Sequence, residues 1–214
     1  MDRRKSDFIF FNKLLPFDAT ILVIGACTGI TTIPFAQGFK QRNVLAYEPL
    51  PDNFRILTKI VGFFKCNNIQ LFSFGLSDKD SATQMILPVV NGVKKHGMAH
   101  IDADFIQEYR EGISYSTELR KADTRPELAE KKINAIKLVA ENYELPILLG
   151  AKEIILKNRP LIYCELWQNE HRSAVLSFIQ SLEYRIYFRQ GKLLTEYSGS
   201  NYSGKNFIFK SKYE

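Results

Sequence analysis

A glycine-bounded loop and an acidic residue stand directly after two neighbouring apolar segments of the chain. The loop reads GACTG over residues 25–29, and Glu48 follows the apolar segment 44–47. Glycines let a ligand approach the backbone at the start of a following helix. An acid after the second strand can accept hydrogen bonds from ribose hydroxyls. The pattern predicts a nucleotide site on a Rossmann-like sheet, and the alternative is a glycine turn that only packs a helix against a strand.

The middle position of this loop bears on which ligand it accepts. A dinucleotide loop has a glycine there, so that the backbone can approach a pyrophosphate, whereas this chain has Cys27. The side chain disfavours NAD or FAD and is neutral for a phosphate-free ligand such as S-adenosylmethionine. The sequence contains no Walker A motif, which disfavours ATP bound in that mode. A nicotinamide-dependent oxidoreductase therefore remains a disfavoured alternative.

Two histidines form the second candidate for chemistry. His96 and His100 lie four residues apart, and Asp102 and Asp104 follow them. Such a cluster could bind a metal, but Gly97 interrupts any helix that would place both imidazoles on one face. Asp104 is typical of the residue that caps a helix over 105–111. We therefore expect no metal site here and interpret the segment as a solvated loop, with a substrate-facing histidine as the alternative.

The remaining elements must position the loop and the acid. Apolar segments alternate with helical ones, which is typical of parallel strands joined by right-handed crossovers. The sequence therefore predicts an α/β, Rossmann-like sheet with helices on both faces. The expected strands are 20–24, 44–47, 70–74, 133–139, 161–165, 184–189 and 206–210, and the expected helices are 8–15 (capped by Ser6 or Asp7), one from 31, 52–64, 144–158 and 169–182.

One segment, 79–132, breaks this alternation. It contains a predicted strand at 84–87, a Gly/Lys loop at 91–97, a helical piece at 104–111 and a charged, irregular stretch up to 132. Because ligands of open α/β sheets bind beyond the carboxyl ends of the strands, we interpret 79–132 as an inserted cap that contacts the acceptor. The length of 214 residues suits a single domain over 1–214 that contains this insertion.

Composition restricts the classes of partner. The net charge of +6 favours an anionic surface or substrate over other partners, although a basic surface that binds nothing is the commoner case. No basic run with interleaved aromatic residues indicates specific nucleic-acid binding, and no apolar stretch is long enough to span a bilayer. Cys27, Cys66 and Cys164 lack the C-x-x-C spacing, which fits a protein of the reducing cytoplasm. The oligomeric state stays open.

Three separated segments resemble the FkbM-type methyltransferase family. ILVIGACTGITT is similar to its D-x-G-A-N-x-G loop, and AYEPLPDNFRIL to its E-P-x-P-x-N segment. AIKLVAENYELPILLGAKEIILKNRPLIYCEL resembles its pattern I-K-x-D-x-E-G-x-E, followed by L-x-G-A and R-P-x-x-x-E. The resemblance implies a seven-strand class I methyltransferase fold, S-adenosylmethionine as the methyl donor, and O-methyl transfer to a sugar, glycan or small-metabolite hydroxyl.

The resemblance also implies roles for individual residues. Glu141 is the first candidate for a general base that activates the acceptor hydroxyl, and Glu144 is the second, with a helix-capping role as its alternative. In the donor site, Glu48 would hold the ribose and the loop would hold the amino acid end. The full set implied for donor binding is Gly25, Ala26, Cys27, Thr28, Gly29, Glu48, Pro49, Asn53, Ser77 and Asp78.

The sequence departs from the family pattern at four positions. Val23 and Val139 replace two acids, Asn142 replaces a glycine, and Cys27 replaces the loop asparagine. We expect the two acids to be missing from the same pocket, which would impair turnover, whereas donor binding would survive through Glu48 and the backbone contacts of the loop. This leaves a second function open, an adenosylmethionine-binding homologue with impaired or no catalysis that acts as a binding or regulatory protein.

Overall fold

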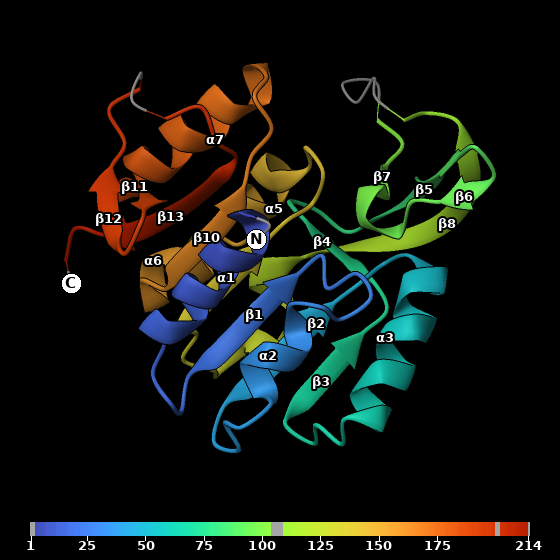
Figure 1. Cartoon of the computed structure of the whole chain (residues 1–214), viewed down its shortest axis with the longest axis horizontal. Helices are drawn as coiled ribbons and strands as arrows, with labels where there is room; N and C mark the ends of the chain where they lie inside the picture. The colour runs from blue at the N-terminus through green and yellow to red at the C-terminus, as the bar shows by residue number, and fades with distance from the viewer. Residues whose placement is uncertain (1–2, 104–108, 200–201, 214) are drawn as a thin grey trace.

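A mixed sheet of eight strands forms the centre of the protein in a computed structural model, which describes residues 3–103, 109–199 and 202–213. Its order is β12-β11-β13-β10-β9-β1-β2-β3, with five parallel strands at one side (Figure 1). The parallel strands are β1 (Thr20–Ile24), β2 (Asn43–Tyr47), β3 (Ile69–Phe72), β9 (Ala135–Leu138) and β10 (Leu161–Glu165), and the antiparallel ones are β11 (Tyr184–Gln190), β12 (Leu193–Glu196) and β13 (Asn206–Ser211).

The predicted fold class is confirmed, and the seven expected strands are all present. The strands 20–24 and 161–165 have the predicted bounds, because each is a continuous apolar run that is buried on both faces. The eighth strand, β12, was not predicted. It forms a hairpin with β11 through the turn at Gly191, where φ is +64°, and its half-exposed residues lack the apolar pattern of the central strands.

The register places the chemistry at one edge of the sheet. Ile24 is paired with Tyr47 of β2 on one side and with Leu138 of β9 on the other, and Leu138 is paired with Cys164 of β10. The residues that follow these strand ends therefore lie side by side. They include the glycine loop after β1, Glu48 after β2, and the segment that contains Glu141 after β9.

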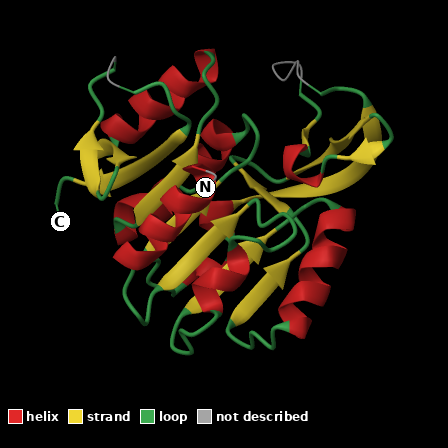
Figure 2. Ribbon diagram, viewed as in Figure 1, coloured by secondary structure: helices red, strands yellow, loops and turns green. Residues whose placement is uncertain are grey.

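Helices cover both faces of this sheet (Figure 2). One face packs α1 (Arg3–Leu14), α2 (Thr32–Ala36) and α3 (Pro51–Phe63) against side chains such as Ile21 and Val23. The other face packs α5 (Glu144–Gly150), α6 (Lys152–Asn158) and α7 (Glu170–Ser181) against the alternate residues, such as Leu22 and Ile24. This alternation is the two-residue period of a strand.

Two helix predictions need correction. The first helix begins at Arg3, so neither Ser6 nor Asp7 caps it; Asp7 is buried inside the helix and accepts a hydrogen bond from Asn206 of β13 at 2.9 Å. The helix predicted over 144–158 is two helices, α5 and α6, which meet at Ala151. At this break, a Cβ on Gly150 would lie 1.8 Å from the carbonyl oxygen of Ser77, so the chain passes in backbone contact with another strand.

The segment that breaks the alternation forms a second sheet, which lies beyond the carboxyl ends of the central strands (Figure 1). The stretch predicted to be irregular is instead a ten-residue strand, β8, in which Ile113, Tyr115, Thr117 and Leu119 alternate with polar residues. The predicted helix over 104–111 falls largely outside the described residues. The elements are β4 (Gly75–Ser77), β5 (Ser81–Val90), β6 (Val93–Lys94), the 3-10 helix η1 (His96–Met98), β7 (His100–Ile101), β8 (Gly112–Lys121), η2 (Ala122–Thr124) and α4 (Pro126–Ala129).

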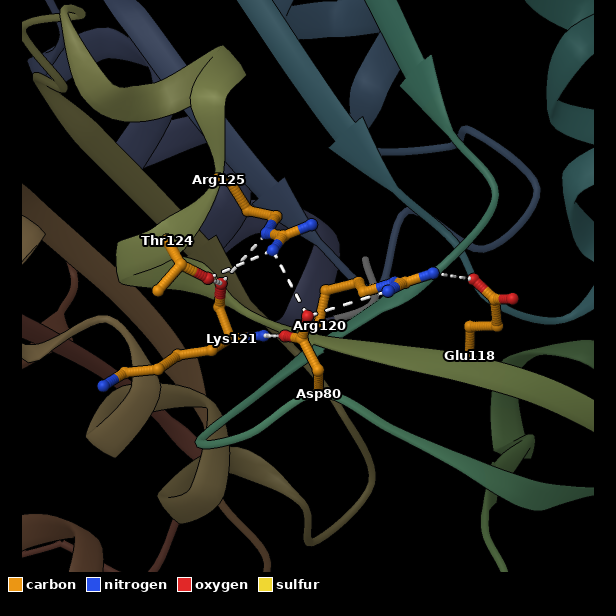
Figure 3. A network of polar contacts seen from close by, with 6 residues as sticks. All are labelled: Asp80, Glu118, Arg120, Lys121, Thr124 and Arg125. Carbon is orange, nitrogen blue, oxygen red and sulfur yellow. Dashed lines mark hydrogen bonds and ion pairs between the residues drawn. The ribbon is translucent and has the colours of Figure 1, made fainter.

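A polar network holds the base of the second sheet (Figure 3). Asp80 accepts hydrogen bonds from the backbone N–H of Lys121 at 2.7 Å and from Arg125 at 3.4 Å, and it forms an ion pair with Arg120. Just beyond, Asp123 accepts hydrogen bonds from the first N–H groups of α6, at 3.0 and 3.1 Å. These contacts join the end of β8 to the helical layer of the central sheet. No helix in the described ranges is long and apolar enough to cross a membrane.

Candidate active site

A cavity of about 780 Å³ opens at the carboxyl edge of the parallel strands. Its walls come from the segments after β1, β2, β9 and β10, from α1, and from the second sheet. The volume lies in the range that is usual for a site that binds a small molecule or cofactor. The register described above explains why residues far apart in the sequence meet here.

The glycine loop has a backbone that few residues could adopt. The N–H groups of Gly25 and Ala26 both donate to the carbonyl oxygen of Tyr47, at 3.1 and 3.0 Å. Gly25 has φ of +71°, and a Cβ there would lie 2.0 Å from the carbonyl oxygen of Val139. Cys27 also has a positive φ, +51°, in the left-handed region that asparagine tolerates better than other side-chain-bearing residues. The loop is therefore in close contact with the backbone directly after β9, and its residues line the cavity.

Glu48 is fixed by donors from three positions. Its Oε2 accepts a hydrogen bond from the N–H of Cys27 at 2.7 Å, while Oε1 accepts from the N–H of Leu50 at 3.1 Å and from Nδ2 of Asn53 at 3.4 Å. The side chain is buried yet lines the cavity. Burial raises the pKa of Glu48, and the backbone donors at Cys27 and Leu50 act in the opposite direction. Since a carboxylate offers about four acceptor positions, one remains for a ligand hydroxyl.

Asn53 connects this carboxylate to the second sheet. Its Oδ1 lies 2.7 Å from Nδ1 of His96, and its Nδ2 donates to the backbone oxygen of His96 at 3.2 Å. Beside this contact, Nζ of Lys94 donates to Asp52 at 2.7 Å. These contacts therefore hold the η1 turn against α3, close to Glu48 and the glycine loop.

A strained turn after β9 carries Glu141. Glu141 and Asn142 both have positive φ values, +47° and +76°, which is uncommon for residues with side chains and concentrates at functional sites. The indole N–H of Trp167 donates to Oε2 of Glu141 at 3.1 Å. Burial, reinforced by the nearby Glu165 carboxylate, raises the pKa of Glu141 to about 7. Glu141 is therefore poised to exchange a proton near neutral pH.

Lys137 is a functional candidate that the sequence reasoning missed. It lies in the middle of β9, is 4% exposed, and its Nζ donates to the carbonyl oxygen of Gly25 at 2.7 Å. Burial lowers the pKa of Lys137, and the nearby Cys27, Glu165, Glu48 and Glu141 act in the opposite direction. The signal was a lysine inside the apolar segment 135–138, where a charge is retained only if it has partners.

Eight of the twelve residues expected in the site line the cavity together, namely Gly25, Ala26, Cys27, Thr28, Glu48, Pro49, Asn53 and Glu141. The other four, all within the described ranges, do not line it. Gly29 packs against α3, since a Cβ there would lie 2.9 Å from Leu57. Asp78 is exposed and accepts a hydrogen bond from Ser77, whose hydroxyl also lies 2.9 Å from that of Tyr143.

Glu144 is the fourth residue that does not line the cavity. It is 3% exposed, and its Oε1 accepts a hydrogen bond from the N–H of Ala140 at 2.9 Å. Burial raises the pKa of Glu144 to about 8. It thus closes the turn that presents Glu141. On the side of the cavity where Ser77 and Asp78 were expected, the lining residues are Gly75, Leu76 and Leu119.

The histidine segment is not the solvated loop that we predicted. His100 is buried, with its Nδ1 3.0 Å from the backbone oxygen of Met98, and both His96 and His100 line the cavity. Among the residues that the structure describes, no three His, Cys, Asp or Glu side chains gather so that they could hold a metal ion. The cysteines at 27, 66 and 164 are free thiols.

The two valines that replace family acids belong to one apolar cluster. Val23 is fully buried in the layer between the sheet and α1 and α2, outside the cavity lining. Val139 packs against the same cluster and borders the cavity. Val23 is paired with Lys137 of β9, which lines the cavity two residues before Val139. The expected effect of the two losses on turnover stays a prediction.

Comparisons with known proteins agree with this geometry. The model of the methyltransferase FkbM domain matches residues 24–186. An FkbM methyltransferase from Methylobacillus flagellatus KT superposes with a TM-score of 0.62 and 14% identity, over 92% of this chain but 45% of that chain. The present chain thus spans less than half the length of that protein. No curated protein matches the sequence.

Two further solved structures share the fold. A SAM-dependent O-methyltransferase from Thermotoga maritima has a TM-score of 0.52 and 10% identity, over 99% of this chain and 66% of that one. A candidate methyltransferase from Streptococcus mutans in complex with SAH has a TM-score of 0.55 and 10% identity, over 98% of both chains. With the family model covering most of the sequence and the cavity at the expected edge of the sheet, the chain belongs to the FkbM methyltransferase family.

Proposed function

We propose that the protein is an S-adenosylmethionine-dependent O-methyltransferase that acts on a hydroxyl of a sugar, glycan or small metabolite. One observation carries the proposal. A single cavity joins the Glu48 carboxylate and the glycine loop at one end to Glu141, with its pKa near 7, at the other. A methyltransferase needs this combination, because the donor and the acceptor hydroxyl must meet in one enclosed space.

The residues at the donor end fit adenosylmethionine. Glu48 keeps an acceptor position for a ribose hydroxyl, and the loop from Gly25 to Thr28 would hold the amino acid end. The side chain at Cys27 leaves no room for the close pyrophosphate approach of a dinucleotide loop, which favours a phosphate-free ligand. On the far side of Glu48, the apolar wall of Leu76 and Leu119 suits a flat base.

The donor, when bound, supplies a methyl group on a sulfonium, which passes to the acceptor oxygen while the electron pair of the broken carbon–sulfur bond stays on sulfur. The protein's part is to align the acceptor and manage its proton. In its ionised form, Glu141 accepts the proton of the hydroxyl, and Trp167 holds the carboxylate in place. Lys137 fixes the carbonyl of Gly25 and so the shape of the loop.

Binding without turnover is the alternative, and Val139 favours it. A family acid at that position would border the cavity, and its loss removes one carboxylate from the acceptor side. Calorimetry with adenosylmethionine, together with mass spectrometry of an acceptor panel for SAH and methylated product, separates the two. Donor binding without product from any acceptor supports the alternative. Binding of NADH in place of adenosylmethionine would instead support the nicotinamide-dependent oxidoreductase.

Two further proposals concern the domain organisation of the chain and its location in the cell. The insertion 79–132 caps the cavity within a single domain over 1–214, since His96, His100 and Leu119 of this segment all contribute to the wall. The free state of the three cysteines fits the cytoplasmic location that we propose. Limited proteolysis would test the first proposal, because cleavage inside 79–132 should be slowed by adenosylmethionine.

A further inference from the structure

The residues that line the cavity fall into two groups according to the strands they follow, and we call the group away from the donor residues the second arm. The donor end lies over β1 and β2, where Glu48 and the glycine loop face the second sheet. The other arm lies on the opposite side of β1, above β9 and β10, between α1 and the start of α2. Adjacent strands are about 4.8 Å apart, so this arm is separated from Glu48 by the width of two to three strands.

The walls of this second arm are apolar. Phe8 and Ile9 of α1 form one side, Ile30 and Pro34 form the other, and Tyr163 of β10 lies between them. Phe8 is held rigidly, because its ring packs edge-on against Phe35 with 4.9 Å between centroids. These side chains offer shape and apolar contact, and the neutral polar groups of the arm are those of Asn12, Thr31 and Tyr163. The amide of Asn12 is already hydrogen-bonded to the backbone oxygen of Pro34 and to Arg42.

Two aliphatic side chains at the mouth of the arm are exposed without a ligand. Ile30 is 78% exposed and Ile9 is 37% exposed, and both line the cavity, Ile9 from α1 and Ile30 from the loop before α2. Single exposed apolar residues are ordinary on a protein surface. Two that line the same cavity are different, because a ligand that filled the arm would cover both side chains and remove their apolar surface from water.

The charges of the arm disfavour an anion. Its carboxylates are Glu141, which follows β9, and Glu165, which ends β10. Lys137 is the sole lysine or arginine among the described residues that line the cavity, and its Nζ donates to the carbonyl oxygen of Gly25. Its charge already faces the three carboxyl groups Glu48, Glu141 and Glu165. A phosphate or carboxylate placed here would add a further negative charge to this excess of acids, and burying a charge without a partner of its own is costly.

We propose that the acceptor is an uncharged molecule with an apolar or aromatic body, which lies between Ile9 and Ile30 while its hydroxyl reaches Glu141. This inference rests on the proposed function and narrows it, since it disfavours the anionic acceptors that the net charge of the protein suggested. Selection is then made by α1 and the loop before α2, and the second sheet covers the donor end.

The experiment measures the binding of small probes by saturation-transfer NMR, with and without SAH. The probes are 2-naphthol, which is uncharged and aromatic, and glucose 6-phosphate, which is anionic and polar. The variants are Ile30→Ser and Ile9→Ser. The control is Leu193→Ser in β12, which removes an aliphatic side chain that is 72% exposed and lies outside the cavity lining.

We expect 2-naphthol to bind more tightly than glucose 6-phosphate, and its dissociation constant to rise roughly 3–10-fold in each isoleucine variant. Leu193→Ser should leave it unchanged, and all three variants should bind adenosylmethionine like the unmodified protein. Equal or tighter binding of glucose 6-phosphate, or isoleucine variants that behave like Leu193→Ser, would overturn the proposal. The proposed function fails separately, if the unmodified protein does not bind adenosylmethionine. In that case, binding of 2-naphthol that is weakened by Ile30→Ser would still support the apolar arm.

Discussion

Carboxylates line the cavity at both of its ends, and the two are held in different ways. Glu48 is buried and accepts hydrogen bonds from two backbone N–H groups and from Asn53, which fix its position. Glu141 is half-buried, accepts a hydrogen bond from Trp167, sits on a turn with positive φ, and is close enough to Glu165 for the second carboxylate to raise its pKa. The first arrangement suits a carboxylate that must stay in one place, and the second suits one that must take up and release a proton.

Replacement of Glu141 tests this contrast with the largest expected effect. We expect Glu141→Gln to reduce kcat by about 10²–10⁴-fold, because the neutral amide cannot accept the proton of the hydroxyl. The dissociation constant of adenosylmethionine, measured by calorimetry, should change little. In the unmodified enzyme the rate should rise with pH through about 7, since the ionised form is the base, and the variant should lack this limb. An equal loss of binding and turnover would place Glu141 among the binding residues.

Replacement of Gly25 tests whether the donor end depends on backbone shape. Gly25→Ala places a methyl group 2.0 Å from a carbonyl oxygen at positive φ, so we expect a loss of roughly 3 kcal/mol or more in the free energy of unfolding. Gly38→Ala is the matched control, because Gly38 also has positive φ (+81°) but nothing lies within 4 Å. It should cost about 1–2 kcal/mol. Urea unfolding measures both, and equal losses would contradict the close approach of the loop to β9.

Glu144 shows the effect of burial on the pKa of a carboxyl group that does not line the cavity. Its pKa is raised from 4.5 to about 8, so the folded protein binds a proton that the unfolded chain releases. The stability from this group is fully present below about pH 4.5 and is lost as the pH rises through about 8. We expect Glu144→Gln to be more stable than the unmodified protein at pH 9, by about 2–4 kcal/mol, and similar at pH 5. Parallel stability curves across this range would refute the assignment.

The smallest expected effect concerns Glu48. Glu48→Ala should weaken adenosylmethionine binding by about 1.5–3 kcal/mol, the cost of a lost hydrogen bond to a charged group. It should also lower stability, because the N–H groups of Cys27 and Leu50 lose their acceptor. Glu48→Gln retains an acceptor oxygen and serves as the control for folding. Donor affinity that is unchanged in both variants would mean that the ribose is held elsewhere.

The central sheet could be predicted from the sequence because its strands are short apolar runs in a regular order. Thr20–Ile24 and Leu161–Glu165 are examples, and both are buried on both faces. The second sheet was missed because β8 alternates serine and charged residues with its apolar ones, so that one face stays polar. A period-two pattern from Ile113 to Leu119 was present, but Thr117 stands at one of its inward positions and weakens the apolar signal.

Most of the expected site residues line the cavity because they stand next to the strand ends that meet there. Glu48 and the glycine loop follow strands directly, and Asn53 lies in the first turn of α3. Ser77 and Asp78 do not line the cavity: Ser77 is buried, with its hydroxyl against Tyr143 and Asp78, and Asp78 is exposed. Positive φ at Glu141 and the hydrogen bond of Lys137 depend on tertiary contacts, which local sequence does not encode.

One amide side chain, Asn53, has a consequence for how molecules pass through the protein. It donates hydrogen bonds to Glu48 and to the backbone oxygen of His96, and its Oδ1 lies 2.7 Å from the ring nitrogen Nδ1 of His96, so one side chain joins the end of β2 to the second sheet. We therefore expect a ligand to enter or leave only when these hydrogen bonds break together. Exchange should then be slower than diffusion through a permanently open channel. Residence time, more than affinity, would then be the property that mutation of Asn53 or His96 alters.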